Sequence, residues 1–276
     1  VIGGRYAIHK AFRYNGEGGI YHGIDTATEQ KIVLREIRRG INPRLGGKVM
    51  PEGYSIQKEA RLMQMAQHTG LIPAYVDHFQ EDGHWFLVQQ RLLDTKTLWG
   101  HAMDIYFALP PVTGRHLTLT LLPLFIKLAR GLQKIHGCGV ILRDLTRTNV
   151  LVTPEGNPCF IDLEFAHGID EDSPWIHGWT PGFASPQQRG DQSPSTSDDC
   201  YAFGVLLLDV LTFCATGMEL HKPAIMQRLR RNLADLDMPA ALYPLIDGLI
   251  NADPATRLDL DQAIASLEQM LQEHAA

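Results

Sequence analysis

The chain has 276 residues, which is enough for one large domain or two small lobes with a substantial core. Its net charge is −6, and this mild acidity disfavours a nucleic-acid-binding surface, which normally shows clustered Lys and Arg. The longest apolar stretch, residues 205–216, is too short to cross a bilayer and contains Asp209, so we expect no membrane partner. The four cysteines show no CxxC pair, which favours a reducing cytoplasm.

An antiparallel meander with a glycine-rich turn is predicted at the start of the chain. Residues 5–13 alternate loosely, residues 15–19 read NGEGG, and further strands are expected at 20–25 and 32–37. Glycine lets a backbone approach an anion closely and offer its N–H groups, so this turn is a candidate phosphate-covering loop. Any hairpin turn can carry glycine, however, so the signal is weak by itself. The glycines of the turn are Gly16, Gly18 and Gly19.

Helical patterns dominate the rest of the chain after two more strands. A helix is predicted over residues 51–69, before Gly70, and strands at 71–79 and 85–92. Residues 117–139 then predict a long, largely buried helix. Further helices are expected at 199–212, 223–233, 239–251 and 260–273.

The segment after the long helix carries the chemistry. Asp144 is followed five residues later by Asn149, then by apolar strands at 150–152 and 159–161, and the second strand leads into Asp162. Asn149 and Asp162 offer oxygen ligands from two loops, and Mg²⁺ prefers such hard donors together with phosphates. Either aspartate alone would more often be a loop or cap residue. The combination indicates phosphoryl transfer.

These residues resemble the catalytic and metal-binding loops of protein kinases, and the resemblance extends in order over essentially the whole chain. It implies an α+β, bilobal kinase-like fold, with an antiparallel sheet and one helix in an N-lobe at 1–93 and a mainly helical C-lobe at 94–276. It also implies ATP or GTP with Mg²⁺, and a Ser/Thr-containing protein or peptide substrate. Asp144 would then be the base and orienter for the incoming hydroxyl, with Asn149 and Asp162 holding the metal.

The resemblance places a nucleotide pocket on the N-lobe. Arg35 ends the third strand where kinases have a Lys, and Glu59 on the predicted helix would pair with it. This exchange is not conservative, because the arginine fork is longer and differently directed. The backbone of a hinge at residues 90–92 would recognise adenine, and Gln89 would lie at the back of the nucleotide pocket. The residues expected around the nucleotide are Gly16, Gly18, Gly19, Val33, Arg35, Gln89, Gln90 and Leu92.

An activation segment is implied at residues 166–188, closing with a sequence similar to that of kinases. Its final acidic residue is replaced by Gln187, so the usual ion pair with Arg257 would become a hydrogen bond. Asp199 would tie down the backbone of the catalytic loop. The phosphorylation candidates in the segment are Ser173 and Thr180, and Arg143 would be the cation that meets such a phosphate.

Departures from the kinase pattern leave two functions open. Leu142 replaces the usual His, Thr146 replaces the usual Lys after Asp144, and Arg35 replaces the phosphate-binding Lys. The chain is therefore either an active Ser/Thr kinase or, as the alternative, a pseudokinase that would bind nucleotide or a partner without phosphoryl transfer.

Three short motifs suggest a closer resemblance. Residues 18–21 (GGIY), 33–36 (VLRE) and 161–164 (IDLE) look like the GGVY, VLKE and IDxE of kinase domains in class III and IV lanthipeptide synthetases. Such domains phosphorylate Ser and Thr of a precursor peptide, and linked lyase and cyclase domains act next. The chain begins with Val, so we expect it to be a piece of a longer protein of this kind. An ordinary bacterial Ser/Thr kinase domain is the alternative.

Overall fold

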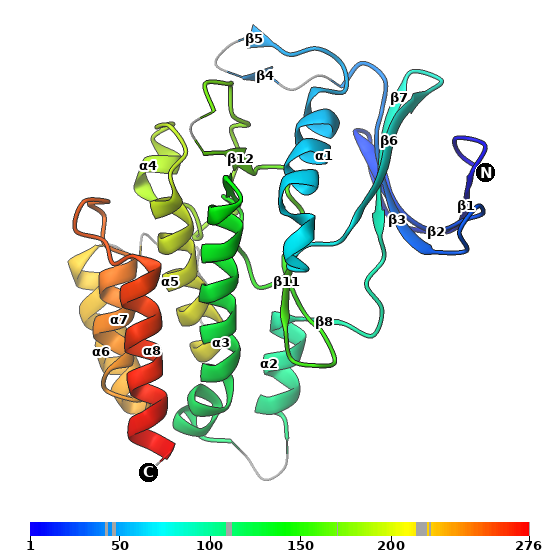
Figure 1. The fold of residues 1–276 in the computed structure, drawn as a ribbon. Coiled ribbons are helices and arrows are strands. Elements are labelled where there is room, and N and C mark those ends of the chain that lie inside the picture. The colour runs from blue at the N-terminus through cyan, green and yellow to red at the C-terminus, as the bar shows by residue number, and fades with distance from the viewer. Residues whose placement is uncertain are drawn as a thin grey trace. The chain divides into compact units, whose positions relative to one another are not determined.

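An antiparallel sheet organises the N-terminal part of the chain (Figure 1). The computed structural model describes residues 1–41, 44–45, 48–108, 112–169, 171–213, 220 and 222–275. The chain divides into two compact units. Unit 1 comprises Val1–Leu93 with Glu171–His177, and unit 2 comprises Asp94–Asp170 with Gly178–Ala276.

The sheet of unit 1 has the strand order β1-β2-β3-β7-β6, with antiparallel neighbours throughout. The strands are β1 (Tyr6–Tyr14), β2 (Gly18–Asp25), β3 (Lys31–Ile37), β6 (Tyr75–Glu81) and β7 (His84–Gln90). Side chains alternate between the two faces of a strand, so the buried Ile32 and Leu34 share one face, where the core forms. Val33 and Arg35 consequently occupy the opposite face.

Helix α1 (Tyr54–Ala66) packs against β6 and β7 and continues into the short η1 (Gln67–Thr69) (Figure 1). Residues 171–177 also belong to this unit. The Tyr54 hydroxyl donates to the Pro174 carbonyl over 3.0 Å, and Arg61 forms an ion pair with Glu171. A separate hairpin joins β4 (Arg44–Leu45) to β5 (Lys48–Val49).

Unit 2 is mainly helical and is built around α5 (Thr196–Thr212), whose residues 198–211 are all buried. A capping box between Ser195 and Asp198 starts this helix, and its side chains are buried all round because other helices cover it. The long α3 (Gly114–Gly137) packs against α5 and α8 (Leu260–Ala275). The remaining helices are α2 (Leu98–Tyr106), α4 (Pro186–Arg189), α6 (Pro223–Asp235) and α7 (Leu242–Leu249).

Two small sheets hold the segment between α3 and α5. Strand β10 (Val150–Val152) pairs with β11 (Pro158–Phe160) on one side and with β8 (Lys96–Thr97) on the other. Strand β9 (Val140–Ile141) pairs with β12 (His167–Gly168). The ends of the chemistry-bearing segment are therefore fixed by strand pairing.

The α+β class and the order of the main elements are confirmed. The predicted bounds of the glycine turn, residues 15–19, are wrong at the C-terminal end. Gly18 and Gly19 lie inside β2, and only the residues before them form the turn. The strand expected from residue 71 begins at Tyr75, and the helix expected from Asp199 begins at Thr196. Among the described residues, none of the helices combines the length and apolar character needed to span a bilayer.

Candidate functional site

A buried ion pair joins the sheet of unit 1 to its helix. Arg35 comes from β3 and Glu59 from α1, and 2.9 Å separates Arg35 Nη2 from Glu59 Oε2. Their side chains are only 16% and 4% exposed, so solvent screens the attraction little. The structure therefore brings these two predicted residues together and fixes α1 against β3, while their catalytic role remains a prediction.

The glycine-rich turn is closed by its own asparagine. Asn15 Oδ1 accepts hydrogen bonds from the backbone N–H groups of Glu17, at 2.9 Å, and Gly18, at 3.2 Å. A Cβ on Gly18 would lie 1.9 Å from the Glu36 carbonyl oxygen, so close approach of β2 and β3 itself requires glycine there. A Cβ on Gly16 would meet nothing within 4 Å. Of the three glycines predicted for the loop, Gly16 thus lacks such a packing reason to be glycine.

The predicted hinge offers one backbone donor. Gln89 is the cross-strand partner of Val33, which places both on the face that carries Arg35. The N–H of Gln90 donates to the Ala74 carbonyl at 2.8 Å, whereas the Leu92 N–H has no hydrogen-bond partner among the residues that the structure describes. Leu92 can thus donate to a bound base, as backbone recognition of adenine requires.

In unit 2, Asp199 at the start of α5 anchors the catalytic loop. Its carboxylate accepts hydrogen bonds from the backbone N–H groups of Leu142 and Arg143, each at 2.8 Å, and contacts His136 Nε2 at 2.8 Å. Arg143 has a φ of 65°, a left-handed conformation that non-glycine residues rarely adopt. The strained backbone is held by a fully buried carboxylate. The predicted role of Asp199 is thus observed.

Asp144 is held by two side-chain donors. Asn149 Nδ2 donates to its Oδ2 at 2.8 Å, and the Thr180 hydroxyl donates to its Oδ1 at 2.7 Å. Burial raises the pKa of Asp144 above its ordinary value, and the negative charge of Asp162 adds to the effect. The Asp144 carboxylate is therefore oriented and partly desolvated, and it lies close to a second carboxylate.

The two predicted metal ligands are coupled through the backbone. The Ile161 N–H donates to the Asn149 carbonyl at 2.9 Å, which links the loop before β10 to the loop after β11. Because Asn149 turns its amide nitrogen toward the acceptor-only carboxylate of Asp144, its amide oxygen is directed elsewhere. Asp162, exposed and with a φ of 65°, adds a carboxylate. This donor set fits Mg²⁺, which takes hard oxygens and keeps water and phosphate ligands.

Among the residues that the structure describes, no larger acidic or thiolate cluster accompanies Asn149 and Asp162. Within the described ranges, no three His, Cys, Asp or Glu side chains gather as metal ligands.

At the position where kinases carry a Lys after the catalytic Asp, this chain has Thr146, and its neighbour Arg147 does not take the place of that Lys. Thr146 is buried and accepts the Asn149 N–H at 3.3 Å, while Arg147 contacts Asp209 at 2.6 Å and lies 3.8 Å over the Trp99 ring. The Arg147 side chain is thus held by Asp209 and Trp99, so it does not supply the cation that the Lys would provide.

The end of the activation segment is tied to the helical unit. Arg257 Nη2 donates to Gln187 Oε1 at 2.7 Å, which is the hydrogen bond expected in place of an ion pair. Gln188 Nε2 donates to the Arg143 carbonyl at 2.9 Å, a support that the sequence did not reveal. Arg143 itself is 4% exposed and donates to the Phe165 carbonyl, so it does not present a surface cation to a phosphate here.

Sequence reasoning also missed how Asn15 and Thr180 act. The sequence shows Asn15 only as part of the glycine turn and Thr180 only as a phosphorylation candidate. In the structure, Asn15 accepts backbone hydrogen bonds within the turn, and the Thr180 hydroxyl contacts Asp144. Ser173, the other candidate, donates to Glu171 at 2.6 Å. Thr180 is separated from Asp144 by 36 positions, so no local pattern could have indicated the contact.

Comparison with known proteins points the same way. The protein kinase domain family matches residues 15–267. The chain is 27% identical to serine/threonine-protein kinase pkn2 of Myxococcus xanthus over 221 residues, which are 77% of this chain and 25% of that protein. It is 26% identical over 202 residues to the probable SapB synthase of Streptomyces coelicolor, with coverages of 68% and 20%. It is 23% identical over 223 residues to serine/threonine-protein kinase PknL of Mycobacterium tuberculosis, and these residues are 77% of this chain and 50% of that protein. The chain therefore spans at most half the length of these relatives.

Proposed function

The chain belongs to the protein kinase family, and from this premise we propose that it is a Mg²⁺-dependent domain that transfers the γ-phosphoryl group of ATP or GTP to Ser or Thr hydroxyls of a protein or peptide. One observation carries the proposal. The Thr180 hydroxyl donates to Asp144 Oδ1 at 2.7 Å, so this carboxylate can accept a proton from an aliphatic hydroxyl at normal hydrogen-bond distance.

Asp144 orients the hydroxyl of the substrate and accepts its proton, and Asn149 keeps the carboxylate turned toward it. The amide oxygen of Asn149 and the carboxylate of Asp162 would hold Mg²⁺, and Arg35 with Glu59 beside it would contact the phosphates. Bound Mg²⁺–nucleotide supplies the phosphoryl group and neutralises the charge that develops on it. The protein contributes mainly positioning, which can lower such a barrier greatly.

The finer proposal is that the hydroxyls belong to a lanthipeptide precursor. It rests on the motifs GGIY, VLRE and IDLE and is supported by the similarity to a probable SapB synthase, of which the chain spans 20%. Linked lyase and cyclase domains would then act on the phosphorylated peptide. Free thiols at Cys159 and Cys200 agree with a reducing, cytoplasmic setting. A coding sequence that continues into a lyase domain would support this assignment, and one that continues into an unrelated domain would oppose it.

A second candidate function is nucleotide binding without transfer. It is favoured by Asn15, whose side chain occupies two of the N–H groups that a phosphate-covering loop would offer. The non-conservative Arg35 and the absence of a lysine at Thr146 favour it too. A pseudokinase would use the same pocket for regulation or assembly.

Nucleotide binding and turnover, measured on the same preparation, separate the two candidates. Binding of ATP and GTP is measured by calorimetry with and without Mg²⁺, and transfer is measured with γ-labelled nucleotide and a Ser/Thr-rich peptide. The kinase proposal expects Mg²⁺-dependent binding together with labelled peptide. Binding of ATP or GTP, without transfer of phosphate from either nucleotide, would establish the pseudokinase instead.

A further inference from the structure

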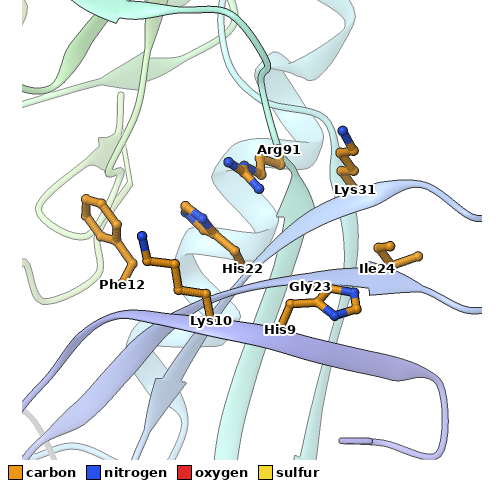
Figure 2. A pocket seen from close by; sticks show the side chains of 8 residues that line it. All are labelled: His9, Lys10, Phe12, His22, Gly23, Ile24, Lys31 and Arg91. Carbon is orange, nitrogen blue, oxygen red and sulfur yellow. The ribbon is translucent and has the colours of Figure 1, made fainter.

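A pocket of about 400 Å³ lies on the sheet of unit 1 (Figure 2). It contains none of the residues assigned to the nucleotide but adjoins them, because Arg91 lies between Gln90 and Leu92. Lys10 is the cross-strand partner of His22, and His22 is the partner of Val33, so all three share the face that carries Arg35. The lining residues are His9, Lys10, Phe12, His22, Gly23, Ile24, Lys31 and Arg91.

Irregularities in β1 shape this pocket. The register of β1 against β2 shifts between Ile8 and Lys10 and again between Ala11 and Arg13. Each shift leaves one extra residue, His9 or Phe12, without a cross-strand partner. Such bulges twist a strand and redirect its side chains. They bring Lys10 and Phe12 beside His22, as Figure 2 shows.

The pocket carries positive charge without compensation. Lys10, Lys31 and Arg91 line it, and none of its lining residues is a carboxylate. None of these three cations forms a hydrogen bond or ion pair through its side chain with any residue that the structure describes. Burial lowers the pKa of His22, and the charges of Arg91 and Lys10 lower it further, so His22 is neutral near pH 7. The chain as a whole has a net charge of −6, so these three basic side chains form a local concentration of positive charge.

An apolar group lies beside the charges. Phe12 is 65% exposed, and its ring stacks on His22 with centroids 5.3 Å apart. A large exposed aromatic next to cations suits a partner that offers both apolar and acidic side chains.

We propose that this pocket binds an acidic segment of the peptide substrate, outside the residues that are phosphorylated. The occupant is a peptide rather than a single phosphate because the cations come from three separate elements. In Figure 2 Lys31 stands apart from the group formed by Lys10, His22 and Arg91. Separated charges match several carboxylates along an extended chain, whereas a phosphate site gathers its donors around one point. The inference rests on the proposed function only in naming the peptide as the substrate.

Fluorescence anisotropy tests the proposal without nucleotide or turnover. The probe is a fluorescein-labelled Glu- and Phe-containing peptide that lacks Ser, Thr and Tyr, so failure of phosphoryl transfer cannot affect it. The whole 276-residue chain is used. We expect saturable binding that weakens with added salt, because screening acts on exposed charges. A peptide with Lys in place of Glu serves as the charge control.

Charge reversal localises the binding. Lys10→Glu and Lys31→Glu should each weaken binding about tenfold, because an attraction is replaced by a repulsion. Arg228→Glu changes an exposed cation on α6 by the same charge and should leave the affinity unchanged. Both lysines are exposed, and circular dichroism checks that each variant is folded. Equal effects of the three reversals, or no effect of Lys10→Glu and Lys31→Glu, would overturn the proposal. Displacement of the peptide by inorganic triphosphate at similar concentration would replace it with a phosphate site.

Discussion

Replacing Asp199 with Ala should destabilise unit 2 and release the catalytic loop. The side chain is fully buried and accepts the backbone N–H groups of Leu142 and Arg143. A buried amide that loses its acceptor costs about 1–3 kcal/mol, so two of them cost about 2–6 kcal/mol. Relaxation of the left-handed Arg143 backbone offsets about 1–2 kcal/mol of that. We therefore expect the free energy of unfolding to fall by about 3 kcal/mol.

Urea denaturation measures this loss, and hydrogen exchange shows where it arises. The amides of residues 142 and 143 should exchange faster in Asp199→Ala, while those in the middle of α3 stay protected. Asp247→Asn, at an exposed position on α7, is the control and should change neither quantity. An unfolding free energy within about 1 kcal/mol of wild type, with protection of residues 142 and 143 unchanged, would refute the anchoring role.

Three further predictions concern the two units. Glu59→Ala leaves a mostly buried guanidinium without its carboxylate, so stability should fall by about 3 kcal/mol in urea denaturation, and no change would exclude a structural ion pair. Gly18→Ala forces a Cβ against a carbonyl oxygen and should cost about 1–3 kcal/mol, whereas Gly16→Ala should cost much less; equal thermal shifts would contradict this packing argument. Without divalent cations, Asp162→Asn should lower the pKa of Asp144, because one negative charge is removed, and an unshifted carboxyl titration by NMR would show that the two groups do not interact.

The sequence predicted the fold well because its signals were of long range and redundant. Strand and helix periodicities agreed with the order of a whole kinase domain, so small errors at the ends of elements did not change the α+β class. The pairing of Arg35 with Glu59 followed from that order as well. Each of these inferences used a pattern that extends over many residues or over the family.

What the sequence did not predict depends on single contacts between distant residues. The glycines at 18 and 19 suited a phosphate loop, but tight packing against Glu36 places Gly18 in a strand. The hydroxyl of Thr180 on Asp144 and the amide of Gln188 on the Arg143 carbonyl bring together residues 36 and 45 positions apart. Two-residue strands such as β9 and β12 carry too few residues to show a period.

Phosphoamino-acid analysis after incubation with γ-labelled nucleotide and Mg²⁺ tests the central claim most directly. The account predicts label on Ser or Thr of a peptide substrate with the wild-type chain. It predicts loss of that label in both Asp144→Asn, which removes the proton acceptor, and Asp162→Ala, which removes the metal-binding carboxylate. Wild-type transfer that persists at the same rate in both variants would contradict the assignment of the site.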